Sequence, residues 1–194
     1  RQSRKNNFDY DTYEKVKHIK TGFSLKHLND DNSSIDSYLF YQKRDFNSKL
    51  PFNYGGIISL ERDYYGIGTK YSNQFFSDNK LRIVTLGIDY SNQQDDRKRF
   101  KNNLGEKGEN TFDQIENFKS TGVYFINQTN YTSGLLLRYG VRYDENKIGT
   151  DSEAFISLNK FNPSLGVSYS ISESDNIYFS TGTSFETPTL NELS

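Results

Sequence analysis

The sequence predicts an all-β fold of antiparallel strands in an up-and-down order, and three observations support this prediction. Apolar and polar residues alternate with a period of two along most of the 194 residues, and helical spacing is nowhere sustained. Aromatic residues make up 15% of the chain although the mean hydropathy is only −0.84, so apolar material is present but interleaved with polar residues. Short and long connections also alternate between the expected strands, as in a meander.

The strands follow from the alternation, taken in chain order. The stretch "IKTGFSLKHL" alternates clearly in the first strand, "VTLGIDY" in the fourth, "GLLLRYGVRYD" in the sixth and "FNPSLGVSYSIS" in the seventh. The second and third strands alternate less well, since "YLFYQKRDF" places aromatic residues on both faces. The eight expected strands lie near residues 14–28, 35–46, 56–74, 80–94, 116–129, 134–146, 161–172 and 176–185.

The connections predict a barrel that crosses a membrane. The connections after the second, fourth and sixth strands are the longer ones, and the loops expected at 95–115 and 147–160 are the longest. Alternation of this kind gathers short turns at one end of the sheet and long loops at the other, as in outer-membrane barrels. A soluble β-sandwich alternates in the same way and is the competing interpretation. Strands longer than ten residues and polar faces rich in Gly, Ser, Arg, Lys and Asp favour the transmembrane β-barrel.

The faces of the seventh strand can be assigned from this interpretation. Leu165, Val167, Tyr169 and Ile171 are expected to point toward lipid, and Ser164, Gly166, Ser168 and Ser170 into the lumen. Tyr90, Tyr143, Tyr169 and Phe185 lie toward strand ends, where girdle aromatics or ordinary cross-strand packing would place them.

Composition argues against several other functions. The formal net charge is −1, which does not suggest a nucleic-acid partner, and there are no cysteines for disulfides or thiolate metal sites. His18 and His27 fall on opposite faces of the first strand and cannot share a metal. No nucleophile is paired with a base. We therefore expect no enzyme activity, no metal and no cofactor.

Four motifs, in order, resemble TonB-dependent outer-membrane receptors. They are "LGIDYSNQQDDR", "FDQIENFKSTGVYF", "GVRYD" and the long stretch "FNPSLGVSYSISESDNIYFSTGTSFETPTLNEL". Together they cover roughly residues 55–194, and the first 50 residues merely fit. Any one of these motifs is short, and the ordered set is what is specific. The family-motif residues are Gly140, Arg142, Tyr143, Asp144, Phe185, Pro188, Thr189, Glu192 and Leu193. The terminal turn has two alternative explanations, a cap at Thr187 before Pro188 or a capping box from Thr189 to Glu192.

The resemblance implies that residues 1–194 are part of a receptor β-barrel domain, contributing about eight of about 22 strands. A plug domain and further C-terminal strands would lie outside the chain. The implied function is uptake of a scarce ligand such as an iron–siderophore, haem or cobalamin, powered by the TonB complex through the plug. The implied location is the lipid bilayer of the outer membrane of a Gram-negative bacterium. The alternative is a β-rich surface adhesin or binding protein that transports nothing.

The resemblance also suggests where such a receptor would bind. The loops at 95–115 and 147–160 are favoured for contact with a small-molecule ligand. Arg138, Arg142 and Asp144 are expected to face the lumen, where the plug would supply partners for their charges.

Overall fold

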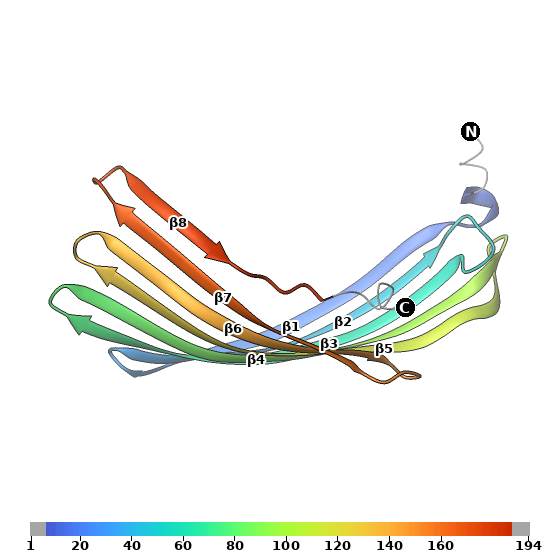
Figure 1. Ribbon diagram of the computed structural model, residues 1–194. Helices are drawn as coiled ribbons and strands as arrows, with labels where there is room; N and C mark the ends of the chain where they lie inside the picture. The colour runs from blue at the N-terminus through green and yellow to red at the C-terminus, as the bar shows by residue number, and fades with distance from the viewer. Residues whose placement is uncertain (1–6, 188–194) are drawn as a thin grey trace.

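The computed structural model describes residues 7–187 and forms one curved antiparallel sheet of eight strands in chain order (Figure 1). The strands are β1 Tyr13–Asp30, β2 Ser33–Lys49, β3 Ile57–Ser77, β4 Lys80–Asn103, β5 Glu106–Tyr131, β6 Leu135–Thr150, β7 Ile156–Ser170 and β8 Asn176–Gly182. The predicted all-β, up-and-down fold is confirmed. The sheet is open, with β1 and β8 at its edges. Pro188, Thr189, Glu192 and Leu193 lie outside the described residues.

The connections fall into two groups at opposite ends of the sheet. Figure 1 shows the β1–β2, β3–β4, β5–β6 and β7–β8 turns on the left and the other three connections on the right. The right-hand group contains Pro51, in the connection between β2 and β3. Each connection therefore lies at the end predicted for it, but the prediction that all connections on the right are the longer ones is wrong. Residues 104–105 form the β4–β5 turn on the right, whereas residues 171–175 form the β7–β8 turn on the left.

The two long loops were predicted wrongly as loops. Strand β4 continues to Asn103 and β5 begins at Glu106, so most of residues 95–115 form a β-ribbon that ends in a tight turn at Leu104 and Gly105. Both turn residues have positive φ angles, of 50° and 95°, as such a turn requires. Likewise, only residues 151–155 separate β6 from β7. The composition of these segments is polar on both faces, which resembles a loop although the backbone ladder continues.

The ribbon is held by side chains at its tip. Lys101 Nζ lies 2.6 Å from Glu109 Oε2, and this ion pair lowers the pKa of the Glu109 carboxyl. Asn102 is fully buried, and its Nδ2 donates to the carbonyl oxygens of Tyr10 and Leu50, each at 3.0 Å. These bonds tie the ribbon to the β2–β3 connection and to the segment before β1.

The sheet is a single layer without an enclosed apolar core. Among the described residues, only Ile57 and Ile148 are buried hydrophobic side chains. Large apolar side chains such as Ile67, Phe161 and Phe179 are more than half exposed, at 56%, 66% and 60%. No helix among residues 7–187 has the length and hydropathy needed to cross a membrane. Burial of apolar surface within this chain therefore cannot account for a stable fold.

Candidate functional site: a polar concave face and an apolar convex face

Two hydrogen bonds identify the concave face of the sheet, because each reaches across an intervening strand. Tyr38 Oη on β2 donates to Asp89 Oδ1 on β4 at 2.9 Å, and Arg142 Nη1 on β6 donates to Asp89 Oδ2 at 2.8 Å. Side chains of alternate strands converge in this way on the inside of a curve. The segment after β8 lies on the same side in Figure 1, where the Asn146 amide donates to Thr187 Oγ1 at 2.8 Å.

These bonds belong to a continuous network that we call the concave belt. Arg142 Nε donates to Asp144 Oδ1 at 2.6 Å, and Asn162 Nδ2 on β7 donates to Asp144 Oδ2 at 3.1 Å. The Arg142 guanidinium also lies 5.5 Å from the centre of the Tyr124 ring. The belt thus extends from β2 to β7 and consists of Tyr38, Asp89, Tyr124, Arg142, Asp144 and Asn162.

Glycines make room for the concave belt on the strands that it crosses. A Cβ added to Gly68 of β3 would lie 2.4 Å from Asp89 Oδ1 and 2.5 Å from the Tyr38 ring. A Cβ at Gly122 of β5 would lie 2.0 Å from Arg142 Nη2. Side chains from alternate strands therefore meet because the strand between them presents glycine at the crossing point.

A second charged group lies on the concave face, nearer the end with the β2–β3, β4–β5 and β6–β7 connections. Arg62 binds Asp95 through two hydrogen bonds of 2.7 and 2.6 Å, and Asp95 is only 4% exposed. Arg97 Nη1 donates to Glu116 Oε1 at 2.6 Å. These ion pairs neutralise most of the local charge and fix their side chains in place.

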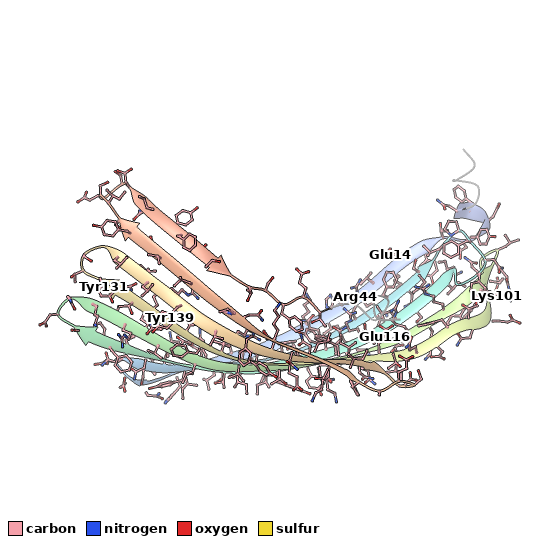
Figure 2. All side chains as sticks on the ribbon, viewed as in Figure 1. Glu14, Arg44, Lys101, Glu116, Tyr131 and Tyr139 are labelled. Carbon is pink, nitrogen blue, oxygen red and sulfur yellow. The ribbon has the colours of Figure 1, made fainter. Side chains whose placement is uncertain are left out.

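Arg44 differs from its neighbours in this group. It lies directly opposite Arg62 in the β2–β3 register, and Figure 2 shows it in the same half of the sheet as Glu116. No carboxylate among the described residues pairs with Arg44, and its buried Nε has no hydrogen-bond partner there. Its guanidinium carbon lies 5.7 Å from the centre of the Phe46 ring. The concave face thus holds one guanidinium beside another, of which only Arg62 has a carboxylate partner among residues 7–187.

The structure brings together some of the residues expected from the sequence. Arg142 and Asp144 meet in the concave belt, where Asp89 and Asp144 both form ion pairs with Arg142. Arg138 alternates onto the same face, opposite Gln128 and Gly166, and has no ion pair within residues 7–187. Contact of these side chains with a plug remains a prediction.

The remaining motif residues that the structure describes lie outside the concave belt. Tyr143 lies on the convex face, with its ring 4.8 Å from that of Phe161, and Gly140 lies on the concave face between Ile126 and Ser164. Phe185 follows the end of β8. Sequence reasoning missed Tyr38, Asp89 and Tyr124, although glycines recurring on the polar faces of neighbouring strands were a visible signal.

The convex face carries an apolar zone with an aromatic border. On β6 the zone covers residues 135–143, with Leu135, Leu137, Tyr139, Val141 and Tyr143 on this face. That length agrees with the about 9–11 residues of a tilted transmembrane strand. We call the border toward the β2–β3, β4–β5 and β6–β7 connections the aromatic girdle; it consists of Tyr41, Tyr65, Tyr90, Tyr143 and Phe161. Beyond the girdle, charged and amide side chains replace the apolar ones on this face.

Within residues 7–187, no three His, Cys, Asp or Glu side chains are grouped closely enough to hold a metal ion.

Solved structures of iron-chelate receptors share the fold of this chain. The ferric citrate transporter FecA in its unliganded form matches with a TM-score of 0.69 and 19% identity, over 88% of this chain and 27% of that one. The siderophore receptor PiuA from Acinetobacter baumannii gives 0.67 and 16%, over 87% and 32%. The open form of the ferric-catecholate import receptor Fiu from E. coli K12 gives 0.72 and 14%, over 91% and 37%.

The present chain therefore spans between 27% and 37% of the length of these receptors. The model of the TonB-dependent receptor-like β-barrel family, a family of receptors rather than enzymes, matches residues 1–194, and the chain belongs to that family.

Proposed function

We propose that this chain forms part of the wall of an outer-membrane receptor that takes up an iron–siderophore in a Gram-negative bacterium. The observation that carries the proposal is the division of one sheet into two unlike faces. The convex face is apolar over a membrane-spanning length and ends at the aromatic girdle, whereas the concave face is lined by the ion pairs of the concave belt. Lipid outside and a polar lumen inside would suit these faces.

The orientation follows from how far the strands extend past the apolar zone. On the side of the aromatic girdle β4 continues from Tyr90 to Asn103, whereas at the other end β6 begins at Leu135 with the zone itself. In barrels of this kind short turns face the periplasm and long projections face the outside. The β4–β5 ribbon and the β6–β7 connection would then project from the cell, and we propose residues 95–115 and 147–160 as ligand-contacting segments. Strands β4 and β5, with 24 and 26 residues, extend well beyond the length that a bilayer requires and would present a rigid surface to the ligand.

The class of ligand is proposed from charge and from the related folds. The names of the similar structures mention ferric citrate, a siderophore and a ferric catecholate. Iron chelated by several carboxylates or catecholates is an anion. Arg44, which has no carboxylate partner among the described residues, supplies a cation on the concave face for such an anion.

The lumen would also receive a plug domain, and through it the TonB complex would drive release. Support for the plug comes from the small side chains on the concave face of β7, namely Ser164, Gly166 and Ser168, which leave space beside the wall. Arg138, exposed on the same face, is our candidate for a plug contact, together with the parts of the Arg142 and Asp144 side chains that stay accessible from the concave side.

Uptake of radioactive iron by cells tests this function. The intact receptor containing these strands is expressed in cells that lack other iron-chelate receptors, with and without TonB, and supplied with ferric citrate, a ferric catecholate, a ferric hydroxamate or haem. We expect uptake of at least one ferric siderophore, abolished without TonB. Labelled cobalamin serves as a further arm. Absence of TonB-dependent uptake of every ferric chelate would reject the proposal, and uptake of haem or cobalamin alone would reject the siderophore assignment.

A further inference from the structure

Two lysines face each other directly on the convex side of the sheet. Lys119 of β5 and Lys147 of β6 are partners in the antiparallel register, and both side chains are exposed. Like charges directly opposite each other destabilise a strand pair. Asn92 of β4, opposite Lys119 on its other side, is neutral and adds an amide donor. This position on the wall therefore gathers hydrogen-bond donors around an unfavourable pair of positive charges.

Each of the two ammonium groups has its own nearest partner, and neither of these partners contacts both lysines. Lys147 Nζ lies 3.3 Å from Glu145 Oε1, and Lys119 Nζ lies 5.2 Å from the centre of the Phe155 ring. No carboxylate within residues 7–187 pairs with Lys119. Other lysines of this face are arranged differently: Lys98 Nζ lies 2.8 Å from Asp96 Oδ2, and Lys43 stands opposite Asp63. Glu145 thus offsets part of the charge of Lys147, whereas the charge of Lys119 has no carboxylate partner within residues 7–187, and an anion shared by the two lysines would reduce their remaining repulsion.

The position of the pair relative to the apolar zone indicates the kind of anion. On the convex face, the pair next to the lysines in the direction of the apolar zone is Thr121 with Glu145. The pair after that is Val123 with Tyr143, which belongs to the aromatic girdle. The lysines thus stand just beyond the aromatic girdle, at the depth where the headgroups of the outer leaflet would lie. The packed rings of Tyr143 and Phe161 form an apolar surface beside the path of an attached acyl chain.

From this arrangement we propose that Lys119 and Lys147 bind the phosphate of a lipid headgroup in the outer leaflet, with the Asn92 amide as an additional donor. The proposal rests on the membrane orientation given under the proposed function. The proposed lipid site lies on the outer wall and not in the lumen, so lipid binding can be tested separately from transport. Neutralising one lysine should weaken binding about fivefold and neutralising both about thirtyfold, if each contributes the about 1 kcal/mol typical of a basic residue at an anionic membrane surface.

Native mass spectrometry of the intact receptor in detergent tests the site, with monophosphoryl lipid A as the anionic probe and phosphatidylcholine as the zwitterionic one. The double variant Lys119→Gln/Lys147→Gln is compared with the control Lys43→Gln/Lys98→Gln, which removes the same charge from the same face. We expect the first variant to lose lipid A binding about thirtyfold and the control to retain it, with phosphatidylcholine unaffected.

Three results would overturn the proposal. They are an equal loss of lipid A in both variants, unchanged binding in the lysine-pair variant, and displacement of bound lipid A by millimolar inorganic phosphate, which would indicate a site for free phosphate. Heat-modifiable electrophoretic mobility confirms that each variant is folded. Because lipid adducts are counted without any measurement of iron uptake, failure of this site and failure of the transport function are distinguishable.

Discussion

Replacement of Gly122 by Ala tests whether the concave belt depends on glycine. The new Cβ would lie 2.0 Å from Arg142 Nη2 and 2.6 Å from Arg142 Cζ, so the guanidinium must move and its bond to Asp89 is lost. A hydrogen bond between charged groups contributes about 1.5–3 kcal/mol, and the 37% exposure of the Arg142 side chain reduces this. Since Ala is otherwise better than Gly in a strand by about 0.5–1 kcal/mol, we expect a net destabilisation of about 1 kcal/mol.

The measurement is the free energy of unfolding of the intact receptor in lipid vesicles, from urea titration followed by circular dichroism. Gly166→Ala is a matched control, because the nearest atom to its added Cβ, other than its chain neighbours, is the Arg138 carbonyl oxygen at 3.9 Å. That variant should be neutral or slightly stabilising. In an Arg142→Ala background, Gly122→Ala should cost little, since the side chain that it displaces is gone. Equal costs in both backgrounds would show that the glycine is required for some reason other than the belt.

Further predictions concern the faces, the lumen and the edges of the sheet. Arg in place of Val167 on the convex face should reduce the amount of folded barrel in the outer membrane, at a cost of about 2–4 kcal/mol, whereas Arg in place of Ser168 should be tolerated far better unless it meets the plug; equal yields would reverse the two faces. Arg44→Gln should weaken binding of an anionic ferric chelate about tenfold, through loss of about 1.5 kcal/mol, without lowering the amount of folded receptor, and unchanged affinity would remove Arg44 from the ligand site. Residues 1–194 alone should aggregate in detergent-free buffer because both sheet edges and the convex face are unprotected, and a dispersed amide spectrum from a soluble monomer would contradict this.

The strands and their order could be predicted from the sequence, because period-two alternation is a local property that survives in a sheet with two unlike environments. The extent of β4 and β5 could not. Between Asp95 and Ile115 both faces are polar, since neither would face lipid, and alternation then carries no signal. Such a segment resembles a loop in composition, although the backbone ladder between β4 and β5 continues through it, with register shifts near Phe100.

The candidate site was predictable only in part for a related reason. Arg142 and Asp144 stand out because they belong to a short motif on one strand. Asp89, the second ion-pair partner of Arg142, lies 53 residues before it, and the bond exists only because β5 presents Gly122 between β4 and β6. Contacts between alternate strands depend on the curvature of the sheet, which no single strand encodes. Tyr38 was harder still to predict, since its strand has aromatic residues on both faces and the sequence does not show which face is concave.

The concave belt has a geometric consequence for the lumen. Bonds between neighbouring strands allow a sheet to bend or flatten, but a bond from β2 to β4, or from β4 to β6, closes a triangle with the strand between them. Each such triangle limits the angle at which three consecutive strands can open. The links among Tyr38, Asp89 and Arg142 thus favour the local curvature that the sheet shows, and we expect a substitution that lengthens or shortens one of them to flatten or tighten the sheet at this point.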